Sequence, residues 1–294
     1  MQYIIMDLEW NSAYSRKKDG FINEIIEIGA VKLDAQFQKT DTFSILVKPS
    51  VSKRLQGRVK ALTHLSNEDV QDGVPYATAM QQFSAWVGDA ENVFLTWGDG
   101  DIRAMLQNNM FFLKIETLPF MQNYVDIQSY CQQRLHLSKT QQVGLSDAAK
   151  KMGLDPDTYA HHRALDDSLL TADCFKTLYD AEAFRDFLRP CNADFYARLT
   201  FKPYFLRDMH DASIPKGTFD CVCDVCGGKL KKEKNWRAQN HAFFGVFYCK
   251  TCNRHIRYTV RCKQLYDRLD IRKSCKEVLP KSKEEEKETT SSKP

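Results

Sequence analysis

The stretch Tyr3-Ile-Ile-Met-Asp-Leu-Glu9 decides how the first part of this 294-residue chain folds. Its apolar run is typical of a buried strand and leads directly into two carboxylates. Because side chains alternate along a strand, Asp7 and Glu9 project from the same face, roughly 6–7 Å apart. Two such charges repel each other unless a cation lies between them, and a divalent metal ion with oxygen ligands meets that need. A structural or solvated pair without metal is the alternative.

A second acidic feature follows in HHRALDDSLLTADCFKTLYD, residues 161–180. At 100° per residue, a helix over 164–180 puts Asp166 on a polar face and Asp167 on the opposite, core-facing side. A carboxylate there is costly unless it is paired or bound to metal, although backbone amides or an arginine would also satisfy it. His162 cannot share a helical face with Asp167. We therefore expect His162 in the loop before the helix, where it could act as a general base.

A third acidic group lies in VFLTWGDGDIRAML, residues 93–106. An apolar strand stops at a Gly-Asp-Gly turn, and a helical period then begins. Either Asp99 or Asp101 could reach the end of the first strand. Only the expected helix start favours Asp101.

The remaining pattern predicts an α/β domain with a mixed five-stranded sheet and flanking helices. The expected strands are residues 3–8, 24–33, 41–48, 92–97 and 123–127, and the expected helices are 76–88, 101–112, 127–135, 145–152 and 164–180.

In their order, these motifs resemble the DEDDh group of 3′–5′ exonucleases, which have a ribonuclease H-like fold. Asp-x-Glu ends the first strand, a central Asp opens a helix, and His-x4-Asp lies near the end of residues 1–180. The stretches EIIEIGAVKLD and ALTHLSNEDV are similar to further family segments. TWGDGD resembles the Eri-like branch of the group, and this resemblance selects Asp101 over Asp99.

The resemblance implies hydrolysis of phosphodiesters with the help of two Mg²⁺ or Mn²⁺ ions. Asp7 would contact both ions, Glu9 and Asp167 would complete one site, and Asp101 would support the other. His162 would accept the proton of the attacking water. The expected activity is removal of nucleoside 5′-monophosphates from single-stranded 3′ ends, RNA being favoured. A DNA exonuclease of repair or proofreading and a non-catalytic nucleic-acid-binding scaffold are the alternatives.

A separate cysteine-rich unit follows at residues 218–278. Cys223 and Cys226 form one C-x2-C pair, and Cys249 and Cys252 form a second pair 22 residues later. This spacing predicts a zinc ribbon, in which four thiolates hold one structural Zn²⁺. Interleaved lysines, arginines and aromatic residues suit single-stranded nucleic acid, but the aromatic residues could equally form the core of the ribbon, and the surface could dock a protein.

Charge divides the chain as the motifs do. Residues 1–180 carry −5 and residues 181–294 carry +9 of the net charge of +4. We expect an exonuclease domain over 1–180, a connector over 181–217, a zinc ribbon with a basic helix over 218–278 and a disordered tail over 279–294. No apolar run is long enough for a membrane span, and the first residues do not resemble a signal peptide. These features predict a cytoplasmic protein, whose protein partners and oligomeric state the sequence leaves open.

Overall fold

The computed structural model describes residues 1–138, 142–159 and 163–279. The chain forms two compact units, Met1–Thr200 and Phe201–Pro294. The predicted connector over 181–217 is therefore divided between them. The tail over 280–294 lies outside the described residues. No helix in the described ranges is long and apolar enough to cross a membrane.

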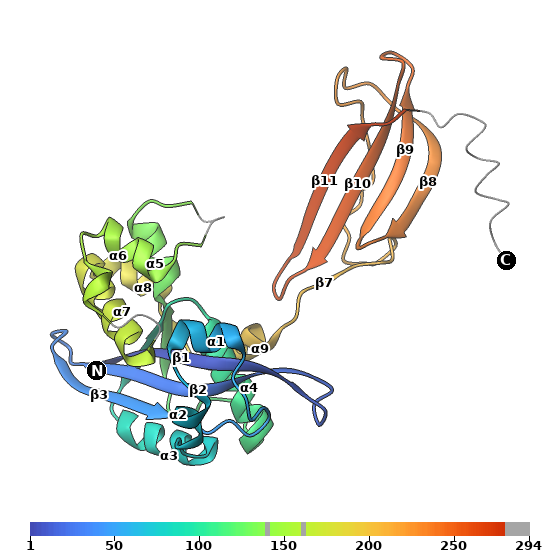
Figure 1. The fold of residues 1–294 in the computed structure, drawn as a ribbon. Coiled ribbons are helices and arrows are strands. Elements are labelled where there is room, and N and C mark those ends of the chain that lie inside the picture. Colours follow the sequence, from blue (N-terminus) through green and yellow to red (C-terminus); the bar gives the residue numbers. More distant parts are fainter. Residues whose placement is uncertain (139–141, 160–162, 280–294) are drawn as a thin grey trace. The chain divides into compact units, whose positions relative to one another are not determined.

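The first unit is built on a mixed sheet with strand order β3-β2-β1-β4-β5-β6 (Figure 1). Strands β1, β2 and β3 form antiparallel pairs, β4 and β5 extend the sheet in parallel, and β6 closes it antiparallel to β5. The strands are β1 (Gln2–Ser15), β2 (Gly20–Leu33), β3 (Lys39–Leu46), β4 (Asn92–Thr96), β5 (Asn123–Asp126) and β6 (Arg189–Pro190). The predicted α/β fold with a mixed sheet is confirmed.

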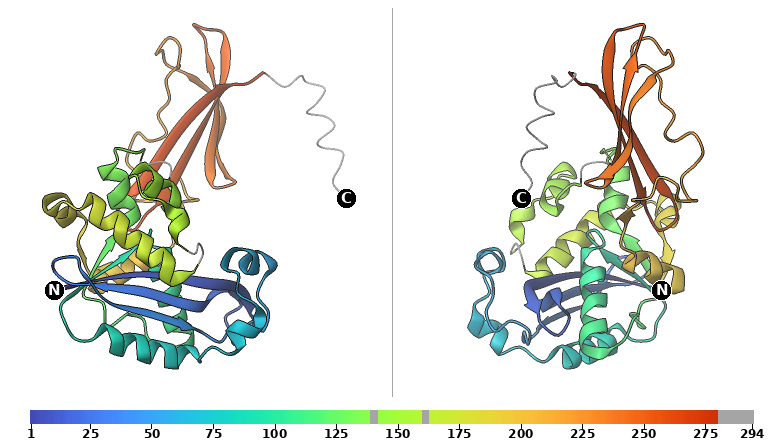
Figure 2. Two further views of the ribbon diagram at one scale, coloured as in Figure 1. Left: turned by 60° about the vertical axis from the view of Figure 1, so that its left-hand side comes forward. Right: turned by 90° about the vertical axis from the view of Figure 1, so that its right-hand side faces the viewer.

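The helices cover both faces of this sheet (Figures 1 and 2). Even-numbered residues of β1, such as Ile4 and Met6, pack with α3 (Tyr76–Val87), α4 (Gly100–Asn108) and α9 (Ala193–Thr200). Odd-numbered residues, such as Tyr3 and Ile5, pack with α5 (Ile127–Arg134), α6 (Leu145–Lys151), α7 (Ala164–Leu178) and α8 (Ala181–Phe187). The alternation of β1 thus assigns Asp7 and Glu9 to the face that carries α7.

Shorter elements complete the unit. Two helices lie between β3 and α3, namely α1 (Gly57–Thr63) and α2 (Asn67–Gln71). A π-helical turn, η1 (Asn109–Leu113), follows α4, and a 3₁₀ turn, η2 (Pro156–Thr158), precedes α7.

The sheet has six strands, not the five predicted. The sixth, β6, is only two residues long and contains Pro190, so no run of strand-forming residues marks it. A proline fits an edge strand because one side of that strand needs no backbone donor. Strands β1 and β2 also extend beyond the predicted 3–8 and 24–33, because they continue as a long hairpin past the rest of the sheet.

The second unit is a sheet with strand order β11-β10-β9-β8, in which the short β7 also pairs with β10. Its strands are β7 (Tyr204–Phe205), β8 (Lys231–Gln239), β9 (Ala242–Cys249), β10 (Arg254–Gln264) and β11 (Leu269–Glu277). All pairs in this sheet are antiparallel. Figure 1 shows β8 to β11 side by side.

The predicted basic helix before residue 278 is wrong, because this segment forms β11 and the end of β10. Leu269 and Ile271, two residues apart, pack into the core of the unit, and Cys275 packs into a neighbouring cluster. This spacing of two suits a strand and not a helix, in which residues two apart do not share a face. Pairing with β10 agrees, because each residue from Leu269 to Glu277 has a partner there.

Candidate functional site

The candidate active site lies where β1 loses its parallel neighbour. Strand β4 pairs with β1 only as far as Ile5, so Asp7 is the next residue of the same face beyond the pairing. In open α/β sheets, ligands bind outside the carboxyl ends of parallel strands. A register shift between Glu9 and Trp10 then marks a bulge, a device that redirects side chains near active sites.

Helix α7 brings Asp167 to the two carboxylates of β1. One carboxylate oxygen from each of Asp7, Glu9 and Asp167 lies within 4.8 Å of the others, and all three residues are partly exposed. We call these three residues the acidic cluster. Three carboxylates at this separation offer the oxygen ligands that Mg²⁺ and Mn²⁺ prefer.

The pKa values in this region reflect burial and the crowding of negative charge. Burial, and after it the carboxylate of Asp167, raise the pKa of Glu9 to about 8. Burial also raises the pKa of Asp7 well above its ordinary range, with contributions from Asp101 and Asp167. A cation bound among these groups would offset their repulsion and favour their ionised forms. The donor set therefore fits a divalent ion.

Asp101 enters the site from the start of α4. It is 4 % exposed, and its Oδ1 accepts a hydrogen bond of 3.2 Å from the backbone N–H of Leu8, between the two carboxylates of β1. Burial raises the pKa of Asp101 to about 7. Asp99 instead pairs with Arg103 at 2.7 Å, and its side chain is 49 % exposed. Proximity to β1 thus distinguishes the two aspartates, which helical position alone had barely separated.

Burial does not separate Asp166 from Asp167 as predicted, since both are partly exposed. Asp167 sits at the rim of the core and not within it, because the site opens to solvent there. What distinguishes Asp167 is its distance to Asp7 and Glu9.

The start of α7 is held against β2 by two features. Arg163 donates to both oxygens of Glu27, with the shortest contact at 2.7 Å from Nη2 to Oε1. Gly29 lets β2 lie close to the start of α7, because a Cβ at this position would lie 2.1 Å from the backbone of Ala164 and Leu165. His162, the predicted general base, lies outside the described residues.

Arg163 and Gly29 were not among the predicted site residues. The sequence offered one signal for Arg163. Glu27 stands inside the apolar run IIEIGAV, and a buried carboxylate needs a cation or hydrogen-bond donors. Glu27 is 1 % exposed, and the partly exposed Arg163 supplies the cation. Nothing in the local sequence marks Gly29 as a contact with α7.

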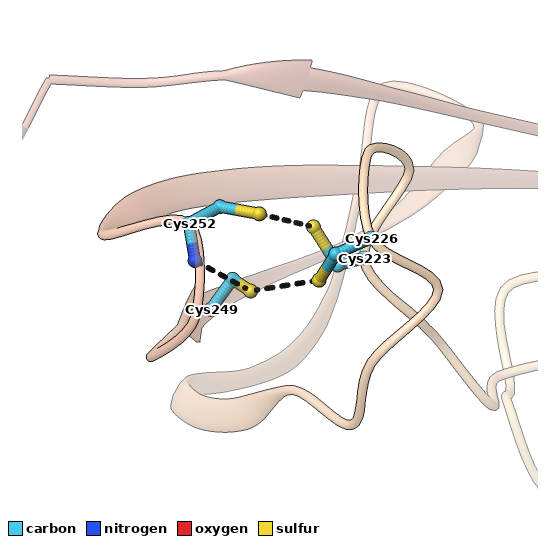
Figure 3. Close-up of side chains that lie close together, drawn as sticks. All are labelled: Cys223, Cys226, Cys249 and Cys252. Carbon is cyan, nitrogen blue, oxygen red and sulfur yellow. Dashed lines mark hydrogen bonds between the residues drawn. The ribbon is translucent and has the colours of Figure 1, made fainter.

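The second cluster consists of Cys223, Cys226, Cys249 and Cys252, whose sulfur atoms all lie within 4.8 Å of one another. Figure 3 shows the first pair facing the second. The Sγ atoms of Cys223 and Cys252 are 3.8 Å apart, and those of Cys226 and Cys249 are 3.6 Å apart. Four convergent sulfur atoms fit a tetrahedral Zn²⁺ site.

The backbone around these cysteines forms two tight turns. Gly227 and Asn253, each directly after a C-x2-C pair, have φ values of 66° and 51°. Such left-handed conformations suit Gly and Asn. The backbone N–H of Cys252 donates to the Sγ of Cys249 at 3.4 Å. Backbone amides, chiefly that of Cys226, lower the pKa of Cys223 to about 7, which favours the thiolate that metal binding requires.

Comparisons with known proteins place the first unit in context. Residues 4–175 match the family RNase_T, described as exonuclease. The chain is 26% identical over 188 residues to the probable 3′-5′ exonuclease KapD of Bacillus subtilis, covering 64% of this chain and 89% of KapD. It is 26% identical over 191 residues to mouse ERI1 exoribonuclease 2, covering 58% of this chain but only 27% of that protein.

A solved structure has the same fold. The nuclease domain of 3′hExo, described as a DEDDh family member bound to rAMP, superposes with a TM-score of 0.52 at 20% identity. The match covers 65% of this chain and 96% of that domain.

Proposed function

The chain belongs to the RNase_T family of exonucleases, and on this premise we propose that it is a two-metal 3′–5′ exonuclease acting on single-stranded nucleic acid. The enzyme class, a 3′–5′ exonuclease of the DEDDh type, follows from the family and from the fold of the first unit. RNA is the favoured substrate, supported by the similarity to an exoribonuclease. Nucleoside 5′-monophosphates are the expected products.

One observation carries the proposal. Asp7, Glu9 and Asp167 converge within 4.8 Å, although burial and mutual repulsion make their joint ionisation costly, as the raised pKa of Glu9 indicates. A protein that keeps such groups together without a counter-charge loses stability. A functional cation site is a sufficient reason to keep them.

Each residue has a distinct part in the proposed mechanism. Asp7, Glu9 and Asp167 would hold one divalent ion, and Asp7 with Asp101 would hold the other. When bound, the ions supply Lewis-acid stabilisation of the charge that develops on the transferred phosphate and the leaving 3′-oxygen. Arg163 and Glu27 keep the start of α7, and therefore Asp167, in position. His162 would accept a proton from the attacking water.

The second unit would bind one structural Zn²⁺ through Cys223, Cys226, Cys249 and Cys252. Metal analysis of the purified chain should find about one zinc per chain. Cys226→Ser should lower this content strongly, whereas Cys262→Ser should not, because Cys262 lies outside the four-cysteine cluster. Zinc far below one per chain in the wild type would refute the assignment.

The catalytic proposal is tested with 5′-labelled single-stranded RNA and DNA of the same sequence, incubated with Mn²⁺. Successive shortening from the 3′ end is expected, faster on RNA. Asp167→Asn should abolish it, and the matched variant Asp166→Asn should not, because Asp166 is outside the acidic cluster. Unchanged shortening by Asp167→Asn would refute the site. Faster shortening of DNA would select the DNA alternative, and no shortening by the wild type would select a binding scaffold.

A further inference from the structure

The sheet of β8 to β11 has one covered face and one that we call the outer face. On the covered face, Phe243, Phe247, Ile256 and Val260 are buried and pack against residues of the preceding segment, including Leu206 and Phe219. Residues that alternate with them point to the other side of the sheet. The outer face is therefore defined by the odd-numbered residues of β10 and by their paired partners.

Three apolar or aromatic residues of β9, Phe244, Val246 and Tyr248, occupy the middle of the outer face. All three are partly exposed, and none belongs to a core cluster formed by the described residues. The cores are built from Trp236, Phe243 and Phe247 and not from these residues, which separates the two roles that the sequence left open for the aromatic residues. Phe244 and Tyr248, four residues apart, stand about 13 Å from each other along the strand.

Basic side chains flank this apolar strip on both sides. On β8, Lys231, Lys234 and Arg237 pair with Tyr248, Val246 and Phe244. On β10 and β11, the basic residues of the outer face are Arg257, Arg261, Lys263, Arg272 and Lys276. Each aromatic ring of the strip thus has a cationic neighbour on the adjacent strand β8.

Several of these cations lie directly opposite one another. Arg257 pairs with Lys276, and Arg261 pairs with Arg272. Like charges opposite each other across strands destabilise a sheet, so an anion that lies between them would relieve the repulsion. Within the described residues, Arg237, Arg257 and Lys276 form no ion pair.

The acids of the outer face do not neutralise it. Glu233 hydrogen-bonds to His255 at 2.7 Å, and Asp270 pairs with Arg272 at 3.1 Å. They leave an excess of positive charge, and this charge complements a polyanion. A folded protein partner would need a matching acidic surface, whereas nucleic acid supplies phosphates at regular intervals.

We propose that the outer face binds single-stranded nucleic acid, with bases stacked on Phe244 and Tyr248 and phosphates contacting the flanking arginines and lysines. Aromatic rings in the middle of a basic sheet suit unpaired bases, because every base offers a face for stacking. A duplex would present its phosphates and keep its bases out of reach. This inference adds a binding surface to the proposed function. It rests on that function only for the class of substrate, single-stranded nucleic acid.

The test is the affinity of the full chain for a 5′-labelled oligouridylate or oligothymidylate of about 30 nucleotides, measured by fluorescence anisotropy. No chelator is added, so that the chain retains its zinc. No divalent ion is added either, so that binding is measured without hydrolysis of the oligonucleotide. Arg237→Glu with Arg257→Glu should weaken binding at least about tenfold and reduce the slope of log affinity against log salt by about 1.4. Phe244→Leu should weaken binding about fivefold or more without changing the slope.

The matched control is Arg207→Glu with Lys216→Glu, which makes the same change in charge on exposed residues of the segment that covers the other face. It should keep wild-type affinity. Zinc content and thermal unfolding verify that each variant is folded. Tyr248→Leu is a second aromatic test, read together with zinc content because the Tyr248 hydroxyl donates to Asn253 beside the cysteines.

Equal loss of binding in the control, unchanged binding by Phe244→Leu, or equally tight binding of a duplex would each overturn the proposal. Because binding is measured without hydrolysis, an inactive wild type in the cleavage assay would leave this result standing. If the enzyme is active but its affinity does not change in these variants, the proposed binding role of the outer face is refuted and the proposed catalytic function stands.

Discussion

The contact between Gly29 and the start of α7 gives a sharp test of how the acidic cluster is positioned. Gly29 lies in β2, and a Cβ there would stand 2.1 Å from Ala164 C and Leu165 N and 2.5 Å from Ala164 O. All three are backbone atoms, so no side-chain rotation can relieve the overlap. Gly29→Ala must therefore separate β2 and α7 by about 1 Å, and overpacking of this kind costs about 1–3 kcal/mol of folding free energy.

The displacement reaches the acidic cluster because Asp167 lies in the first turn of the same helix. Ser168 Oγ donates to the carbonyl of Gly29 at 3.0 Å, a contact that the separation would also weaken. A misplacement of about 1 Å can lower a rate about 10²-fold. We expect Gly29→Ala to remain folded and to lose activity by about that factor.

The assay measures kcat on a 5′-labelled single-stranded oligonucleotide at saturating Mn²⁺, together with the free energy of unfolding in urea. Gly20→Ala is the control, because Gly20 lies in the same strand and a Cβ there meets no atom within 4 Å. A Gly29→Ala enzyme with kcat within a factor of about three of wild type would refute the reasoning, since it would show that α7 tolerates the shift.

Three further predictions follow from the site. Asp101→Asn should lower kcat about 10²-fold or more in the same cleavage assay, whereas the exposed Asp99→Asn should not; equal effects would contradict the assignment. Arg163→Gln leaves buried Glu27 without its cation and should cost about 1–3 kcal/mol in urea unfolding, so an unchanged midpoint would contradict this role. Burial raises the pKa of Glu9 to about 8 and that of Asp101 to about 7. The carboxyls of the unfolded chain titrate near about pH 4. Between about pH 5 and pH 8 the folded metal-free protein therefore binds more protons than the unfolded chain. The melting temperature of the metal-free protein should therefore fall as pH rises through that range. Mn²⁺ should raise the melting temperature more at pH 8 than at pH 5. Thermal scans showing equal stabilisation by Mn²⁺ at the two pH values would count against a metal site in the acidic cluster.

Patterns that depend on neighbouring residues were readable from the sequence. Alternation along β1 assigned Asp7 and Glu9 to one face, and the spacing of the two C-x2-C pairs predicted the cluster of four cysteines that the structure contains. The mixed α/β fold was also predicted correctly. The shared face of Asp7 and Glu9 and the turn at each C-x2-C pair are set by strand or turn geometry over a few residues, which the chain carries locally.

The physical basis of the other features lies in tertiary packing. Residue chemistry alone left Asp99 and Asp101 open, and only the family resemblance selected Asp101. The physical difference is that the carboxylate of Asp101 reaches the backbone of β1, and such a contact between residues 93 positions apart leaves no local pattern. The segment before residue 278 forms a strand whose backbone groups are satisfied by pairing with β10. The spacing of two between Leu269 and Ile271 was a local signal for this strand, which the prediction of a basic helix missed. Arg163 and Gly29 matter because α7 packs closely against the distant strand β2. Local residue propensities do not predict such a contact.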